Sequence, residues 1–330
     1  MTRTVLAADV GGTKTLMARY EVRGGTVRLV REETVLSNDF SSLEQVVRAF
    51  LDGDGEPVQA GVFGIAGPVI EGRAVPTNFS WEAIEQESIA RAMDLDPQRV
   101  RLMNDLETTA CGVPYLGRED LETVNAGVER KGNIAVIAAG TGLGQGILFR
   151  RGDQVLPVAT EGGHASFSPR DDRDVALFRF LRHRFGHVSQ ERVVSGPGLE
   201  NVFDYLRTVE KRPVVPAVLH RLETEDARAV IGGAGVAGTC ATCREAVDWF
   251  VRLYGAQAGN LALTVMALGG VFVGGGIVTK ILPRMTTGAF MDSFVDKGRY
   301  MDLLEEVPVN IILNPKTALL GAAHAAREMV

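Results

Sequence analysis

Residues 4–20 of the chain, TVLAADVGGTKTLMARY, place a glycine turn between two apolar segments. Residues 4–10 are typical of a buried strand, GGT of a tight turn, and residues 14–22 of the strand that leaves it. Gly24 and Gly25 then predict a second hairpin. The same order of strand, turn and strand returns in residues 133–150, NIAVIAAGTGLGQGILFR. Two copies of one plan predict a duplicated protein, with a domain boundary near residue 112.

The composition limits the class of protein. Of the 330 residues, 45% are apolar and 38 are glycine, which suits an α/β protein large enough for two cores. The formal net charge of −6 offers no electrostatic footprint for nucleic acid or an anionic membrane, so we expect small-molecule partners. Three cysteines and the absence of a charged and apolar leader before residue 4 favour the cytoplasm.

Helical and extended patterns alternate along the chain. We expect strands at 58–67 and 99–105, and helices at 41–51, 82–94, 106–113, 172–186, 198–210, 244–268 and near the C-terminus. The first helix carries a capping-box pattern from Ser41 to Glu44. Residues 261–278 lack charge, but five glycines divide them into a helix end, a strand and a turn, which indicates a buried core. Alternation predicts parallel strands, whose carboxyl ends gather ligands.

Three glycine turns are candidate phosphate sites: residues 11–13, 140–142 and 274–276. Glycine lets backbone N–H groups approach an anion, and a threonine hydroxyl adds a donor. A plain hairpin turn is the alternative for each. Asp9, beside the first turn, is able to hold a hydrated Mg²⁺ near phosphates or to cap the turn. The chain has no Walker-type phosphate loop.

Polar side chains at three further places are candidate ligands. Asn104 and Asp105 follow an apolar strand, and the alternative is that Asp105 caps a helix beginning at Leu106. Glu161 and His164 flank two glycines, and a carboxylate with a neutral imidazole suits adjacent sugar hydroxyls. Glu191 alone reads as an exposed charge. The CATC motif at 240–243 reads as a helix start.

Seven segments together resemble the bacterial glucokinases. They are ADVGGTKTLMARY, TNFSW, LMNDLETTACGV, AAGTGLGQGIL, EGGHASFSP, ERVVSGPGLEN and VFVGGGIV, in the family's order and spacing over nearly the whole chain. The resemblance implies an actin-like, ribonuclease H-like duplicated fold of two α/β domains with a ligand cleft between them. It places the small domain at 1–112, completed by a C-terminal helix at about 315–330, and the large domain at 113–314.

The same resemblance implies a kinase that uses ATP and Mg²⁺ to phosphorylate glucose on its 6-hydroxyl, with Asp105 as the catalytic base. The implied sugar ligands are Asn104, Asp105, Glu161, His164 and Glu191. The implied nucleotide and phosphate residues are Gly11, Gly12, Thr13, Gly140, Thr141, Gly142, Gly274, Gly275 and Gly276. Asp9 joins them, on its own chemistry, as the residue expected to hold Mg²⁺ indirectly through water. A homodimer is a further family-level expectation.

The chain departs from the family pattern at two places. Lys14 stands where asparagine is more usual, and the closing LNPKTALLGAA differs from the usual DNPGLLG. Two other functions stay open on sequence alone: a kinase for another hexose, such as mannose or an N-acetylated amino sugar, and a non-catalytic regulator that binds sugar and ATP. The phosphoryl donor also stays open between ATP, ADP and polyphosphate.

Overall fold

The structure of the protein, a computed structural model, describes residues 3–53, 56–75 and 81–330. Residues 77–80 of the TNFSW segment lie outside the described residues. The chain packs into two compact units. The first consists of Met1–Asp120, Gly146–Ala159 and Asn314–Val330, and the second of Leu121–Gln145 and Thr160–Leu313. The predicted domain boundary near residue 112 stays a prediction.

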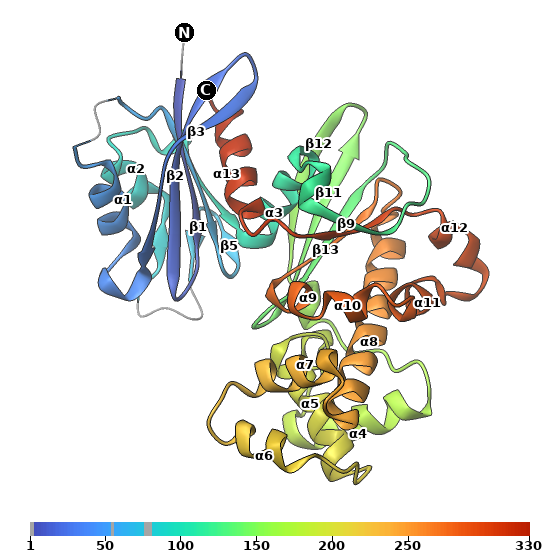
Figure 1. Ribbon diagram of the computed structural model, residues 1–330. Helices are drawn as coiled ribbons and strands as arrows, with labels where there is room; N and C mark the ends of the chain where they lie inside the picture. The colour runs from blue at the N-terminus through green and yellow to red at the C-terminus, as the bar shows by residue number, and fades with distance from the viewer. Residues whose placement is uncertain (1–2, 54–55, 76–80) are drawn as a thin grey trace. The chain divides into compact units, whose positions relative to one another are not determined.

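The first unit is built on a five-stranded sheet in the order β3-β2-β1-β4-β8 (Figure 1). Its strands are β1 (Arg3–Val10), β2 (Lys14–Arg23), β3 (Thr26–Leu36), β4 (Ala60–Ile65) and β8 (Val100–Asn104). Strands β1, β2 and β3 form the two predicted hairpins, whereas β4 and β8 run parallel to β1. The carboxyl ends of three parallel strands therefore meet at one edge of the sheet.

Helices cover both faces of this sheet, which is why β1 is apolar on both sides. The helices are α1 (Leu43–Leu51), α2 (Gln86–Ala92), α3 (Asp105–Gly112) and α13 (Thr317–Arg327). Leu6 and Ala8 of β1 belong to the core that α1 and α2 line, and Val5 and Ala7 belong to the core that α13 lines. A small sheet of β5 (Val69–Ile70), β6 (Arg73–Ala74) and β7 (Ile84–Glu85) completes the unit.

The N-terminus of α1 corrects one sequence prediction. The capping residue is Ser42, whose side chain accepts from the Gln45 N–H, while the Gln45 side chain accepts from the Ser41 N–H. The predicted capping box from Ser41 to Glu44 was therefore wrong by one residue. Consecutive serines, followed three residues later by glutamate and then glutamine, fit the pattern in either register.

The second unit contains most of a six-stranded sheet in the order β12-β11-β10-β13-β14-β9. The strands are β9 (Leu121–Asn125), β10 (Ile134–Ala139), β11 (Leu143–Arg151), β12 (Gln154–Thr160), β13 (Val271–Gly274) and β14 (Val309–Ile312). Strands β10, β13 and β14 are parallel, and β9 is antiparallel to β14. The stretch of β11 and β12 from Gly146 to Ala159 is grouped with the first unit.

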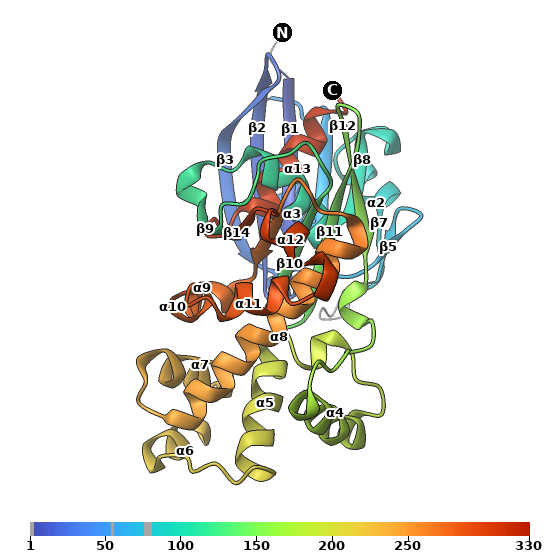
Figure 2. The same cartoon turned by 90° about the vertical axis from the view of Figure 1, so that its right-hand side faces the viewer.

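A large helical layer completes the second unit, and Figure 2 shows its long helix α8 beside the shorter helices. The helices are α4 (Asp172–Phe185), α5 (Gly196–Thr208), α6 (Pro216–Leu222), α7 (Ala227–Ala237), α8 (Ala241–Val265), α9 (Gly276–Lys280), α10 (Leu282–Met285), α11 (Ala289–Val295) and α12 (Met301–Glu305). Cys240 is the N-cap of α8, which confirms the helix-start interpretation of CATC. The uncharged run 261–278 contains the end of α8, strand β13 and a turn at Gly275, as predicted, and then the start of α9, which was not predicted. No helix among the described residues has the length and apolar character needed to cross a membrane.

Candidate active site

Three of the predicted site residues, Asp9, Asn104 and Asp105, lie at the carboxyl edge of the first unit's sheet. Val10 of β1, Ile65 of β4 and Asn104 of β8 are in register across the parallel strands. Asp9 therefore precedes this edge by one residue, and Asp105 follows it. Burial raises the pKa of the Asp9 carboxyl above its ordinary value of 3.8. An ionised Asp9 is thus a costly charge that a nearby cation would stabilise.

Asn104 and Asp105 join strand β8 to helix α3. The helix begins at Asp105 and its N-cap is Asn104, so the predicted start at Leu106 was one residue late. The Asn104 side-chain oxygen accepts from the Leu106 N–H at 2.9 Å, and its amide donates to the Gly67 carbonyl at 3.0 Å. Asp105 Oδ1 lies 2.9 Å from the same Leu106 N–H. Asn104 is therefore held rigidly, and the Asp105 carboxylate sits on the first turn of a helix.

The first glycine turn is closed by hydrogen bonds to its own ends and to Ser37. Gly11 donates its N–H to the Lys14 carbonyl at 3.0 Å, and Thr13 accepts from the Ser37 N–H at 3.0 Å. The Ser37 hydroxyl donates to the Gly11 carbonyl at 2.7 Å. The turn is thus a hairpin loop with a fixed backbone, and the side chains of Thr13 and Lys14 are exposed beside it.

The second glycine turn, Gly140 to Gly142, is held by the neighbouring segment 191–196. The Gly140 carbonyl accepts from the Gly196 N–H at 2.8 Å, at the start of α5. Glu191 Oε2 accepts from the Leu143 N–H at 2.9 Å, directly after the turn. The carboxylate of Glu191, which was predicted as a sugar ligand, therefore lies against a candidate phosphate turn.

The third glycine turn follows β13. Gly275 has φ of 96°, and a side chain there would collide with the Ala139 carbonyl oxygen of β10. Only glycine suits both the left-handed backbone and this close approach. The turns that follow β10 and β13 therefore begin side by side, since Ala138 and Gly274 are paired in register.

Glu161 and His164 lie on one short turn, with the 3-10 helix Gly162–His164 between β12 and α4. Their side chains are 54% and 63% exposed, and His164 Nε2 is 3.9 Å from Glu161 Oε2. The His164 carbonyl lies 3.1 Å from His187 Nε2. A side chain at Gly163 would collide with the Leu143 carbonyl, so the turn rests directly on β11.

Leu143 thereby connects three predicted features of the second unit. Its N–H binds Glu191, its carbonyl contacts Gly163 of the Glu161–His164 turn, and it immediately follows the Gly140–Gly142 turn. The structure brings Glu161, His164 and Glu191 together with that turn. Asp9, the first glycine turn, Asn104 and Asp105 form a second group within the first unit.

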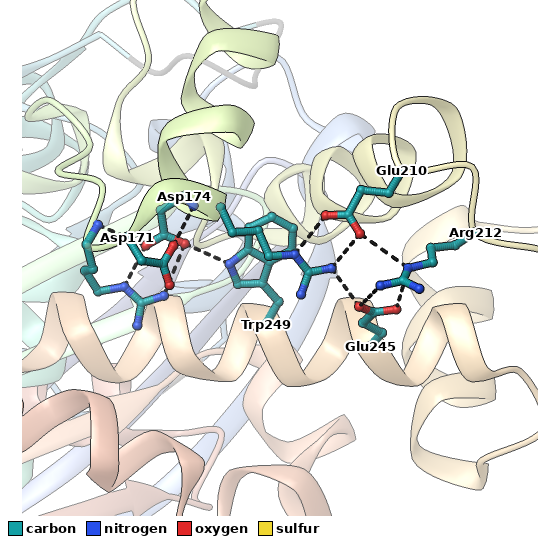
Figure 3. A network of polar contacts seen from close by, with 8 residues as sticks. Asp171, Asp174, Glu210, Arg212, Glu245 and Trp249 are labelled. Carbon is teal, nitrogen blue, oxygen red and sulfur yellow. Dashed lines mark hydrogen bonds and ion pairs between the residues drawn. The ribbon is translucent and has the colours of Figure 1, made fainter.

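A polar network around the fully buried Asp174 follows the Glu161–His164 turn in the chain (Figure 3). Asp174, which is fully buried, accepts from Arg170 Nε at 2.7 Å and from Trp249 Nε1 at 2.8 Å. The Arg173 guanidinium stacks over the Trp249 ring at 4.3 Å and binds Glu210 at 2.8 Å. The end of segment 165–171 is thus attached to α4 through Asp174 and to α8 through the Arg252 carbonyl.

Two supporting residues escaped the sequence analysis. Ser37 closes the first glycine turn, and Tyr254 of α8 contacts the strand ends before the second and third turns. Neither stands in a motif, and no local signal identifies them. Among the described residues, no three His, Cys, Asp or Glu side chains cluster as ligands for one metal ion.

Comparison with solved structures defines the class of the protein, the actin-like sugar kinases. A crystal structure of a glucokinase from an Antarctic psychrotroph superposes with a TM-score of 0.86 at 29% identity, covering 98% of this chain and 99% of that one. A ROK family glucokinase from Streptomyces griseus in complex with glucose and AMPPNP shares the fold, with a TM-score of 0.64 at 24% identity over 98% of this chain and 99% of that one.

Sequence comparison names the family. The Glucokinase family model matches residues 6–329. The glucokinase of Trichormus variabilis is 37% identical over 342 residues, covering 98% of this chain and 99% of the relative. The glucokinase of Psychromonas ingrahamii is 34% identical over 329 residues, covering 99% and 98%. The chain belongs to the glucokinase family and is an enzyme of the kinase class.

Proposed function

We propose that the protein transfers the γ-phosphoryl group of ATP to the 6-hydroxyl of D-glucose. The observation that carries this proposal is the whole-chain match to the glucokinase family, with Asn104 and Asp105 at a carboxyl edge of parallel strands. Phosphoryl transfer needs positioned phosphates, a positioned hydroxyl and a base, and the chain offers residues for each.

Asp105 is the proposed general base. As the glucose 6-oxygen attacks the γ-phosphorus, its proton passes to the Asp105 carboxylate. The bond from the γ-phosphorus to the bridging oxygen breaks, and ADP leaves with those electrons. The position of Asp105 on the first turn of α3, beside the fixed Asn104, supports this role because a base must be held within hydrogen-bond reach.

Glu161, His164 and Glu191 are proposed as sugar ligands together with Asn104. Sugar hydroxyls both donate and accept, and carboxylates with an imidazole match that mixture. Glu161 and His164 point from one turn with exposed side chains, which suits a ligand that arrives from solvent. Glu191 uses Oε2 for the Leu143 N–H, and we assign a sugar hydroxyl to its carboxylate as well.

The glycine turns are the proposed nucleotide site. Gly12 and Thr13, and Thr141 and Gly142, would contact phosphate oxygens through backbone N–H groups and hydroxyls. Gly11 and Gly140 would shape the two turns, because their N–H groups donate to the Lys14 and Gly142 carbonyls. Gly274, Gly275 and Gly276 are assigned to the adenosine side. Asp9 fits a hydrated Mg²⁺, since a carboxylate whose burial disfavours its charge gains from a cation. Bound Mg²⁺ would neutralise phosphate oxygens, and Asp9 would orient it through water.

The proposal extends to a homodimer, on the family resemblance alone, and to the cytoplasm, on the low cysteine content. The substrates are small molecules, glucose and ATP. The division into a small domain at 1–112 with the C-terminal helix and a large domain at 113–314 is part of the same proposal.

A coupled ADP-release assay tests the function. The purified protein is given ATP with glucose, mannose or N-acetylglucosamine, and a reaction without sugar measures background hydrolysis. We expect glucose to give the highest kcat/KM. Preference for another sugar would support the other-hexose alternative, and sugar binding without ADP release would support a non-catalytic regulator. Replacing ATP with ADP or polyphosphate, with detection of sugar phosphate, tests the donor.

A further inference from the structure

We propose, resting on the proposed function, that Tyr254 is a positioning residue for the nucleotide. Its hydroxyl sets the separation between the Gly140–Gly142 turn and the Gly274–Gly276 turn. It does so from helix α8, without belonging to either turn.

The Tyr254 hydroxyl contacts the backbone of both strands that lead into these turns. It accepts from the Ala139 N–H at 3.0 Å on β10. It lies 3.0 Å from the Ile137 carbonyl and 3.1 Å from the Gly274 carbonyl, and its single proton is donated to one of these at a time. One oxygen atom therefore links the last residue of β10 to the last residue of β13.

The Tyr254 hydroxyl lies where the backbone pairing between β10 and β13 ends. Ala138 and Gly274 are the last paired residues of β10 and β13. Gly275 then turns with φ of 96° and packs against the Ala139 carbonyl. The Ala139 N–H and the Gly274 carbonyl therefore need partners outside the pairing of the two strands, and both contact the Tyr254 hydroxyl.

The phenol ring itself is held firmly. Tyr254 has no exposed surface, and the rings of Phe250 and Phe290 pack edge-on against it with centroids 5.9 and 5.8 Å away. Burial raises the pKa of the phenol above its ordinary value, so the hydroxyl keeps its proton. A buried ring on a 25-residue helix therefore holds its hydroxyl at a fixed position beside the two turns.

This placement predicts a selective effect on the nucleotide. The hydroxyl contacts the strands before the assigned phosphate and adenosine turns, whereas it makes no hydrogen bond to the Glu161–His164 turn. Loss of the oxygen leaves the buried Ala139 N–H without its acceptor and frees the two turns to shift. ATP binding should weaken while glucose binding is preserved.

The test is Tyr254→Phe, with Tyr205→Phe as the matched control. Tyr205 is also a buried tyrosine of the second unit, on α5, and packs edge-on against Trp249. The dissociation constant of MgATP is measured by calorimetry, KM values for ATP and glucose by turnover, and Tm by thermal unfolding. For Tyr254→Phe we expect the ATP constants to rise about tenfold, the glucose KM to change less than about twofold, and the control to keep both.

Either of two results overturns the proposal: an MgATP dissociation constant in Tyr254→Phe within about twofold of the unmodified protein, or an equal rise of the ATP and glucose KM values. If Tyr254→Phe does not fold, Phe290→Leu, which removes a ring that packs on Tyr254, must raise the MgATP dissociation constant, and no rise overturns the proposal. Because MgATP binding is measured without turnover, absence of sugar kinase activity would refute the proposed function and leave this test intact.

Discussion

Asp174→Ala is expected to destabilise the second unit strongly. The Asp174 carboxylate accepts from Arg170 Nε at 2.7 Å, from Arg170 Nη2 at 3.2 Å and from Trp249 Nε1 at 2.8 Å. Alanine would leave the Trp249 N–H buried without an acceptor. The Arg170 guanidinium, whose side chain is only 23% exposed, would lose its carboxylate partner and keep only neutral acceptors, the Ser293 hydroxyl and the Arg252 carbonyl. Loss of the Asp174 carboxylate therefore lowers the free energy of unfolding more than loss of a surface ion pair does.

The magnitude follows from these contacts. Removing one partner of a buried ion pair typically costs about 3 to 5 kcal/mol. Partial exposure of Arg170 lets water solvate its guanidinium, so we expect the lower end, about 3 kcal/mol. Urea unfolding followed by tryptophan fluorescence measures it, because Trp249 lies in the network and Trp81 lies in the first unit. Replacing Trp81 with Phe in every sample makes Trp249 the sole reporter.

Glu225→Ala is the control for removing a carboxylate from an arginine. Glu225 binds Arg221 at 2.8 Å, but both side chains are nearly half exposed. We expect no measurable change in the free energy of unfolding. A loss below about 1 kcal/mol in Asp174→Ala, or an equal loss in both variants, would refute the assignment of the network as a buried anchor.

Three further perturbations test the site and the first unit. Glu161→Ala should raise the glucose KM about tenfold, with the ATP KM nearly unchanged, because sugar hydroxyls lose an acceptor; unchanged steady-state kinetics for glucose would remove Glu161 from the site. Asp9→Asn should raise the Tm of the ligand-free protein at pH 7, and this difference in Tm should disappear in acid. Burial raises the pKa of Asp9, so its carboxylate is ionised, and destabilises the fold, only at a pH above that pKa. A lower Tm of Asp9→Asn at pH 7 would contradict this. The free energy of unfolding should also fall as the pH is lowered from about 6.5 to about 4. Burial and Arg327 lower the pKa of His324 to about 4 in the folded protein, so in this range the imidazole binds a proton in the unfolded chain but not in the folded one. A His324→Phe variant with the same decline would exclude His324 as the cause.

The hairpins and turns of the fold were predictable because their signals are local. Gly24 and Gly25 have positive φ, as their hairpin requires, and the apolar run of β1 reflects burial on both faces. The candidate site residues lie in short motifs at the ends of strands. Because parallel strands end at the same edge of a sheet, their order in the chain is enough to predict which of these motifs lie near one another. Helices α4, α5 and α8 likewise follow long periodic segments.

Elements that depend on distant contacts were not predictable. Helix α7 contains three glycines, which disfavour a helix, but Gly235 packs closely against the Cys243 carbonyl of α8. Strands β9 and β14 are short, and they pair residues such as Thr123 and Asn310 that lie far apart in sequence. Helices α6 and α9 to α12 are likewise short, so their periodicity is weak.

The supporting contacts of the site fall in the same category. The bond between Glu191 and the Leu143 N–H joins segments 48 residues apart, and that between Tyr254 and Ala139 joins segments 115 residues apart. A glutamate in a loop and a tyrosine in a long helix carry no sequence signal for these bonds. The motifs therefore identified candidate ligands, whereas the residues that hold them required the three-dimensional structure.

The central claim is that Asp105 takes the proton of the sugar hydroxyl, and the turnover of Asp105→Asn tests it most directly. Asparagine keeps the size and an oxygen that accepts from the Leu106 N–H, so Tm and the glucose dissociation constant should stay near the unmodified values. Asp226→Asn, at the N-cap of α7, is a control for the same chemical change. The account predicts that kcat for ADP release with glucose falls by about 10² to 10⁴ in Asp105→Asn and is unchanged in the control. A folded Asp105→Asn protein that keeps more than about a tenth of the original kcat would contradict it.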